Sequence, residues 1–272
     1  MSLDLKQLED KARKLRMNII RMIGVGRKGH LGGSCSLAEI VSALYFHKMR
    51  HDPTHPGWEE RDRFLLSKGH AALVQYAALA ECGYFPEGEL ERVKELGAML
   101  QGHPDMRKTP GIEANTGSLG QGLSIACGMA AGLRLNKRHS RVYCVVGDGE
   151  MAEGQIWEAA MAAAYYKLDN LIAILDHNGI TATGPIVERF DTNPIPSKWE
   201  AFGWNVQIID GHSMKSIVAA LDKADRIVGQ PKLIIAHTIK GRGIPFAENS
   251  AAYHNGQFTQ EQYDQALREL AG

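Results

Sequence analysis

The chain has 272 residues, 44% of them hydrophobic, and its 31 lysines and arginines are balanced by 31 aspartates and glutamates. This length suits one large α/β domain, and the balanced charge gives no basic field of the kind that nucleic-acid-binding proteins carry. The amino-terminal residues are charged, unlike a signal peptide, and the longest apolar run, Ile125–Leu133, is too short to span a bilayer. We therefore expect neither nucleic acid nor a membrane as a partner.

The first residues of the chain predict two helices. Apolar side chains recur at helical spacing over residues 8–22, and Ser36–Glu39 has the pattern of a capping box that opens a second helix ending near Lys48. The segment His51–Trp58 contains two prolines and is expected to be a loop.

The next segments predict one strand followed by helices. Phe64–Ser67 is a candidate strand, after which Gly69 and His70 turn into an Ala-rich helix. Residues 97–116 are expected to form mostly loop, and Gly120–Leu135 a helix of small residues packed against the sheet.

The middle of the chain has the pattern of a βαβ unit. Val142–Val146 and Leu171–Leu175 are short runs rich in β-branched residues, and the Ala-rich segment Glu153–Leu168 between them is apolar at helical spacing. Such a crossover is right-handed and its strands are parallel, so both strands end at the same edge of the sheet. Asp148 follows the first strand and Asn178 the second, at the edge where open α/β sheets bind ligands.

The last third of the chain extends the same pattern. Val206–Asp210 and Leu233–Ala236 are predicted strands on either side of a helix from about Met214 to Val228, and Glu261–Leu270 is a closing helix. No repeat or linker divides the chain. We therefore expect a single α/β domain over residues 1–272, with a mostly parallel sheet flanked by helices.

The two strand ends carry the donor types that Mg²⁺ prefers. Asp148, Asn178 and a loop carbonyl near Ile180 fit a cation that takes one or two carboxylates and completes its shell with phosphates and water. Gly147 and Gly149 allow close backbone approach, and the helix that follows favours an anion at its N-terminus. A plain polar strand end is the alternative for the G-D-G triplet alone, but the Asn-Gly pair on the next strand favours Mg²⁺ holding a diphosphate.

Neither a second glycine motif nor the cysteines are interpreted as a functional site. Gly24–Gly29 matches G-x-G-x-x-G but follows an amphipathic helix, not a strand, so we expect no nicotinamide site there. The four cysteines lie far apart without a C-x-x-C pair, which is typical of reduced, mostly buried thiols in a cytoplasmic protein. They are Cys35, Cys82, Cys127 and Cys144.

The motif G-D-G-x-x-x-E-G at residues 147–154, with N-G-I at 178–180, resembles the thiamine diphosphate-binding motif. The longer pattern, from about residue 24 to 256, resembles the N-terminal half of transketolases, and its blocks occur in family order. The other blocks are Gly29–Ser34, Arg61–Phe64, Ser67–Ala71, Gly102–Pro104, Thr109–Glu113, Thr116–Gly122, His237–Gly243 and Tyr253–His254. Each block alone is a weak signal, whereas the joint match is specific. The resemblance implies the thiamine diphosphate-binding fold, and in it the diphosphate-binding domain.

Three Gly-His pairs in predicted loops, at His30, His70 and His103, present imidazoles that can contact phosphate or exchange protons near neutral pH. The resemblance implies that His30 and His103 line the substrate channel, and that His70 and His254 contact the diphosphate, with His254 also near substrate. It implies a catalytic set of His30, His103, His254 and Glu153, and metal ligands Asp148, Asn178 and Ile180. The implied cofactor-binding residues are His70, Gly117, Leu119, Gly147, Asp148, Gly149, Glu153, Asn178 and His254.

The remaining histidines and two glutamates have other expected roles. His212 also follows glycine but matches no block and is expected to have no functional role, and His55, His139 and His237 are expected to be structural or solvated. His177 stands where the family commonly has an acidic residue, which leaves the metal ligand Asn178 intact. Glu153 and Glu158 are acids near a helix N-terminus, where they stabilise the helix dipole. In the family such acids instead form a carboxylate network that crosses the interface with the partner domain.

In the family the pyrimidine-binding half is a separate domain that supplies the glutamate activating the cofactor, and this chain matches only the first half. The resemblance thus implies a split transketolase, active with a C-terminal-half partner subunit, most simply as α2β2. It would use thiamine diphosphate and Mg²⁺, which Ca²⁺ may replace, to move a two-carbon ketol unit between sugar phosphates, with pentose phosphates as the default. The alternatives are a subunit of another thiamine diphosphate enzyme, similar to deoxyxylulose-phosphate synthase or a 2-oxoacid dehydrogenase α chain, and a non-catalytic cofactor-binding module.

Overall fold

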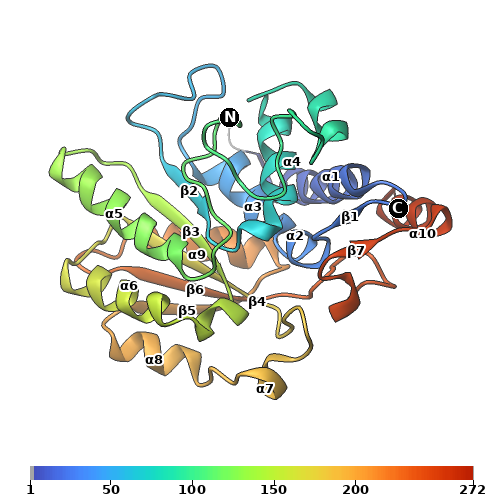
Figure 1. Ribbon diagram of the computed structural model, residues 1–272. Coiled ribbons are helices and arrows are strands. Elements are labelled where there is room, and N and C mark those ends of the chain that lie inside the picture. Colours follow the sequence, from blue (N-terminus) through green and yellow to red (C-terminus); the bar gives the residue numbers. More distant parts are fainter. Residues whose placement is uncertain (1–2, 272) are drawn as a thin grey trace.

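The computed structural model describes residues 3–271 and is built on a parallel sheet of five strands (Figure 1). The strand order is β2-β3-β4-β6-β5, and every neighbouring pair is parallel. The strands are β2 (Arg63–Leu66), β3 (Val142–Gly147), β4 (Leu171–His177), β5 (Asn205–Asp210) and β6 (Lys232–His237). The predicted α/β class with a mostly parallel sheet is confirmed. All five strands end at the same edge.

Both faces of the sheet are buried, which is why its strands read as continuous apolar runs. Alternate residues of a strand point to opposite faces. Tyr143 and Val145 of β3 belong to one core, whereas Cys144 and Val146 belong to the other. Each face therefore requires its own layer of helices.

Two helix layers enclose the sheet. One layer contains α1 (Leu5–Ile23), α3 (Ala38–Ala43), α4 (Ala72–Cys82) and α9 (Met214–Asp225), with α10 (Gln260–Ala271) packed on α1. The other contains α5 (Gln121–Leu135), α6 (Gly154–Tyr165) and α8 (Ile195–Ala201). Most predicted helices are thus confirmed, with boundary shifts of a few residues.

The predicted capping box at Ser36–Glu39 is wrong. Helix α3 has Leu37 at its N-cap and no side-chain cap. The Ser36 hydroxyl instead donates to the Asp176 carboxylate at 2.7 Å, and Glu39 forms an ion pair with Arg16. The predicted helix reaches Lys48 as α3 followed by a π-helical turn (Leu44–Lys48), and a short α2 (Gly32–Cys35) precedes it. Tertiary partners for both polar side chains override the local capping pattern.

Several short elements were not predicted. Strand β1 (Lys28–Gly29) pairs antiparallel with β7 (Gly256–Gln257), and α7 (Ile186–Arg189) lies between β4 and α8. Short 3-10 turns occur at Gly69–Ala71, Glu87–Arg92, Gly149–Ala152 and Ala251–Tyr253. These elements span too few residues to show a period in the sequence. The loop predicted for residues 97–116 is confirmed, since that range contains no helix or strand.

Two further observations concern the chain as a whole. Within residues 3–271 no helix has both the length and the hydropathy needed to cross a bilayer. The four cysteines are free thiols, and three of them, Cys35, Cys127 and Cys144, are buried.

Candidate functional site

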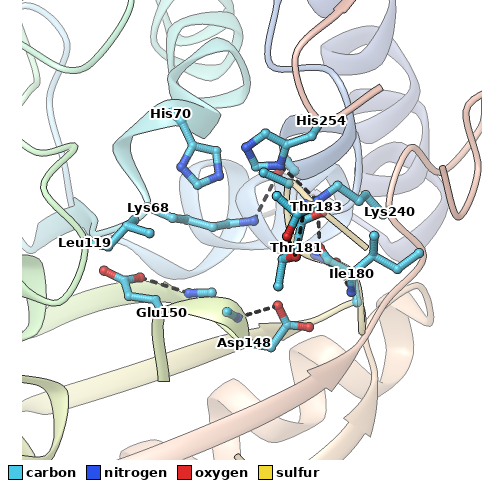
Figure 2. Close-up of a pocket in the computed structure, with 15 residues that line it drawn as sticks. Lys68, His70, Leu119, Asp148, Glu150, Ile180, Thr181, Thr183, Lys240 and His254 are labelled. Atoms are coloured by element: carbon cyan, nitrogen blue, oxygen red, sulfur yellow. Dashed lines mark hydrogen bonds between the residues drawn. The ribbon is translucent and has the colours of Figure 1, made fainter. Parts of the chain in front are cut away.

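A cavity of about 240 Å³ opens at the carboxyl edge of the sheet (Figure 2). Asp148 lies directly after β3 and Asn178 directly after β4, so the parallel strands bring them to one place as predicted. The lining residues are Gly33, Lys68, His70, Leu119, Gly147, Asp148, Gly149, Glu150, Asn178, Ile180, Thr181, Ala182, Thr183, Lys240 and His254.

Asp148 is a buried carboxylate, only 4% exposed. Its oxygens accept hydrogen bonds from the backbone N–H groups of Gly149 and Gly179, which leaves each oxygen a further lone pair. Burial, together with the nearby Asp176 carboxylate, raises the pKa of Asp148 to about 6. Among the described residues Asp148 has no ion-pair partner. An uncompensated buried carboxylate of this kind fits a bound cation, which would stabilise its ionised form.

Asn178 is oriented by its neighbours in the loop after β4. Its side-chain amide donates to Asp176 at 3.0 Å, and its carbonyl oxygen accepts from the Ile180 N–H at 3.2 Å, which leaves that oxygen a further lone pair. Asp148, Asn178 and Ile180 therefore all line one cavity. Within the described part of the chain no three His, Cys, Asp or Glu side chains form a metal cluster. That finding is compatible with a hard-cation site made of one carboxylate, one amide and one carbonyl.

Lys68 and Asp176 form a buried ion pair under the cavity, which the sequence analysis did not single out. Burial by itself would raise the pKa of Asp176, but Lys68 and hydrogen bonds from Ser36 and Thr238 lower it below its usual value. Lys68 also donates to the Gly33 carbonyl at 3.1 Å. The pair fixes the ends of β2 and β4 relative to each other.

Lys240 is the second lysine of the cavity and is 3% exposed. Its Nζ atom lies 2.7 Å from the carbonyl oxygen of Ile180 and 3.0 Å from Nδ1 of His254. Burial, helped by the neighbouring Lys68, lowers the pKa of Lys240 to about 8. No carboxylate forms an ion pair with Lys240 among the described residues. The charge of this ammonium group is therefore uncompensated, although its three donors already contact the carbonyl oxygens of Ile180 and Thr181 and Nδ1 of His254.

Four imidazoles converge above Lys68 and Lys240. The ring of His30 lies 5.3 Å from His70, 6.0 Å from His103 and 5.4 Å from His254. His70 and His254 are 4.9 Å apart and lie side by side in Figure 2. The three Gly-His pairs singled out in the sequence thus meet His254 at one site.

The electrostatic environment keeps these imidazoles uncharged. Burial, with nearby lysines acting in the same direction, lowers the pKa of His30 and of His254 to about 4. Burial and the Lys68 ammonium lower the pKa of His70 to about 2. Burial and Lys94 also lower the pKa of His103. Neutral imidazoles offer one donor and one acceptor each, which suits hydroxyl and carbonyl groups.

The glycines and Leu119 contribute in different ways. Leu119, Gly147 and Gly149, which were predicted to bind the cofactor, line the cavity. Gly117 contacts His103 instead, since a Cβ atom at Gly117 would lie 2.7 Å from that ring. Its φ of 143° also favours glycine.

Glu150 was not predicted as a site residue, although it directly follows the G-D-G triplet at residues 147–149. Its carboxylate accepts from the backbone N–H of Gly120 at 2.8 Å and of Gly147 at 3.0 Å, and from the Ser67 hydroxyl. It ties the start of α5 to the ends of β2 and β3. Thr181 and Thr183 also line the cavity and were not predicted to do so. Lys68 and Lys240 line it too, and both lie within sequence blocks that carry the family resemblance.

Glu153 and Glu158 are not brought into the cavity. Both are exposed on α6, where Glu153 is the N-cap residue and packs beside Gly120. The structure of this chain thus leaves the carboxylates of α6 at the surface, outside the residues that contact the cavity.

Comparisons with known proteins agree with this geometry. Residues 6–272 match the family "Transketolase, thiamine diphosphate binding domain". The chain is 47% identical to the 6-deoxy-6-sulfo-D-fructose transketolase subunit SqwG of Clostridium sp. (strain MSTE9), covering 98% of this chain and 96% of that protein. It is 39% identical to one of the subunits of the apulose-4-phosphate transketolase of Phocaeicola vulgatus, covering 99% of this chain and 95% of that protein.

The crystal structure of transketolase from Campylobacter jejuni superposes with a TM-score of 0.93 at 32% identity, over 99% of this chain and 43% of that one. The fold and the cavity thus define a thiamine diphosphate-binding α/β domain. The chain belongs to the transketolase family of transferases. Within it, the chain corresponds to the N-terminal half and resembles relatives that are separate subunits of about its own length. The transketolase interpretation of the sequence is confirmed over the two alternatives.

Proposed function

We propose that the diphosphate of thiamine diphosphate binds in the cavity through a divalent cation held by Asp148, Asn178 and the Ile180 carbonyl oxygen. The support is the buried, unpaired carboxylate of Asp148 beside two neutral oxygen donors. Mg²⁺ prefers this donor set and leaves positions for phosphate oxygens, and Ca²⁺ takes oxygen donors of the same type. Lys240 faces the same cavity and adds positive charge that attracts a diphosphate, whereas the charge of Lys68, which also lines the cavity, is compensated by Asp176.

The proposed reaction is transfer of a two-carbon ketol unit from a ketose phosphate to an aldose phosphate. When bound, thiamine diphosphate supplies the stabilised carbanion chemistry that this transfer needs. His30, His103 and His254 are neutral near pH 7 and so can donate a proton to, or accept one from, the sugar oxygens. The convergence of these imidazoles above the Asp148 cavity is the observation that carries the proposal.

The substrate is proposed to be a ketose that ends in an anionic group. Both subunit relatives are named for such sugars, one sulfonated and one phosphorylated. Pentose phosphates, and with them the pentose phosphate pathway, are the default within this class. His103 is an exposed residue whose ring lies 6.0 Å from that of His30, which suits a group that meets an entering sugar.

The partner is proposed to be a C-terminal, pyrimidine-binding transketolase subunit, in an α2β2 assembly. Glu153 and Glu158 project from α6 into solvent, which suits carboxylates that contact another chain. The chain is proposed to act as one domain over residues 1–272. A cytoplasmic location is supported by the four free thiols.

The test is reconstitution with the pyrimidine-binding subunit, followed by assays with thiamine diphosphate and Mg²⁺. The panel should include pentose and hexose ketose phosphates and 6-deoxy-6-sulfofructose, each with an aldose phosphate acceptor. We expect ketol transfer from at least one donor and no CO₂ release from pyruvate. Release of CO₂ from pyruvate without ketol transfer would contradict the proposal and favour a deoxyxylulose-phosphate synthase-like or 2-oxoacid dehydrogenase-like enzyme.

A further inference from the structure

A chain of buried polar contacts leads from α1 to the segment that carries Lys240. The Arg16 guanidinium makes two hydrogen bonds to the Glu39 carboxylate, at 2.7 and 2.6 Å. Glu39 in turn contacts Nδ1 of His212 at 3.0 Å. His212 lies in the turn between β5 and α9, and its side chain is 11% exposed.

The other nitrogen of His212 holds the backbone next to Lys240. The Ile239 N–H donates to Nε2 of His212 at 2.8 Å. A backbone amide is only a donor, so Nε2 must be the unprotonated nitrogen and Nδ1 must carry the proton. Nδ1–H then donates to Glu39. The two contacts together fix one neutral tautomer and one orientation of the ring.

The charge of Glu39 is secured chiefly by Arg16. Burial would raise the pKa of Glu39, but Arg16 and the hydrogen bond from His212 lower it to about 2. The carboxylate is therefore an acceptor throughout the physiological pH range. Since Arg16 already compensates its charge, His212 is free to serve as a neutral bridge between Glu39 and Ile239.

The segment that His212 holds is the one that delivers Lys240 to the cavity. The N–H of Thr238 donates to the His177 carbonyl at 3.2 Å, and the N–H of Gly241 donates to the Gly32 carbonyl at 3.0 Å. Between these two backbone contacts, the Ile239 N–H is anchored by a side chain. Lys240 then points to Ile180 and His254.

We infer that His212 is a positioning residue for cofactor binding: its Nε2 atom anchors Ile239, which sets the path of the Lys240 side chain toward the diphosphate. This inference rests on the proposed function, because it assumes that Lys240 meets an anion in the cavity. Partners that orient a binding group typically contribute roughly tenfold to a hundredfold in affinity without touching the ligand.

Two substitutions separate the two contacts of the ring. In His212→Gln the amide oxygen takes the place of Nε2 and can accept from Ile239, while the contact to Glu39 is lost. In His212→Asn the amide nitrogen takes the place of Nδ1 and can donate to Glu39, but the side chain is too short to reach Ile239. A purely structural role predicts that the two variants behave alike.

The measurement is the dissociation constant of thiamine diphosphate with Mg²⁺, by titration calorimetry on the complex with the partner subunit. We expect His212→Gln to bind nearly as wild type and His212→Asn to bind at least about tenfold more weakly. Hydrogen exchange should be faster over residues 238–241 in His212→Asn only. Equal losses in both variants, or wild-type affinity in His212→Asn, would overturn the inference.

A double-mutant cycle checks that the effect passes through Lys240. In a Lys240→Ala background, adding His212→Asn should weaken binding by less than about twofold, because two residues in one chain of contacts are not additive. Independent, additive losses would overturn the positioning role while leaving the proposed function intact. Failure of the wild-type complex to bind thiamine diphosphate would overturn both.

Discussion

The ring centroids of His30 and His254 lie 5.4 Å apart with their planes nearly perpendicular. The cause is the short antiparallel pairing of β1 with β7, in which Gly29 lies opposite Gly256. His30 follows β1 and His254 precedes β7, so this ladder closes the imidazole cluster over the cavity. Two histidines from opposite ends of the chain thereby share one partly buried environment.

The first prediction concerns pH. The pKa of His30 is about 4 in the folded chain, against about 6.5 for an unperturbed histidine. As the pH falls, the unfolded chain binds the proton at a higher pH than the folded chain does. The free energy of unfolding should therefore be greatest above about pH 6.5 and decrease as the pH drops toward 4. Urea unfolding at several pH values should show this decline, and His30→Gln should make it shallower. His139→Gln, on an exposed residue, is the control, and an equal change in both variants would contradict the prediction.

The second prediction concerns the metal. Asp148→Ala should weaken Mg²⁺-dependent binding of thiamine diphosphate to the reconstituted complex by about a hundredfold or more, because no other carboxylate lines the cavity except Glu150. Glu150 cannot replace it, since its oxygens are held by Gly120, Gly147 and Ser67. Titration of Mg²⁺ at fixed cofactor measures the effect, with the exposed Asp191→Ala as control. Cofactor affinity equal to wild type in Asp148→Ala would exclude this metal site.

The third prediction separates binding from chemistry. His103→Ala should leave cofactor affinity near normal, because His103 is exposed and lies outside the residues that line the cavity. It should lower the catalytic rate by roughly 10²–10⁴-fold if the imidazole transfers a proton. Steady-state rates and cofactor titrations on the same preparation give both values. Lost cofactor binding with normal turnover per bound cofactor would reverse the assignment.

The sequence predicted the parts of the site that follow from strand ends and local motifs. The proximity of Asp148 and Asn178 could be predicted because parallel strands end at one edge of the sheet. The ion pair of Lys68 with Asp176 could not be predicted, because it depends on which strands are neighbours and on the burial of both groups. The role of Ser36 was mistaken for a helix cap for the same reason, since its partner Asp176 is distant in sequence.

Some short elements and contacts form only through tertiary packing, so they could not be predicted from the sequence either. The β1–β7 ladder has two residues per strand, too few for any alternation to appear. Glu150 directly follows the G-D-G triplet, but its contact with the Gly120 N–H requires α5 to start beside β3, which the sequence does not show. Patterns of apolar residues fix helices and strands, whereas these contacts depend on how the elements pack.

The fourth prediction concerns the packing that positions Lys68. A Cβ atom at Gly122 of α5 would lie 2.6 Å from the Cα atom of Ser67, so Gly122→Ala must displace the residues that lead into Lys68. We expect a loss of about 1–3 kcal/mol in the free energy of unfolding. Gly128 is exposed on the same helix and has open space at its Cβ position, so Gly128→Ala should instead stabilise the chain by up to about 1 kcal/mol. Chemical denaturation of both variants tests this contrast, and equal effects would contradict it.

The last prediction concerns the partner subunit. The isolated chain should fold, because both faces of its sheet are covered by its own helices. It should bind thiamine diphosphate weakly and show no ketol transfer, because in the proposed assembly the pyrimidine-side contacts belong to the partner. A ligand at a hundred times its dissociation constant adds about 2.7 kcal/mol of stability, which for a domain of this size raises the melting temperature by several degrees. Calorimetric scans with micromolar cofactor should therefore show little shift for the chain alone and a clear shift once the partner is present. Full transketolase activity from the purified chain alone would refute the subunit interpretation.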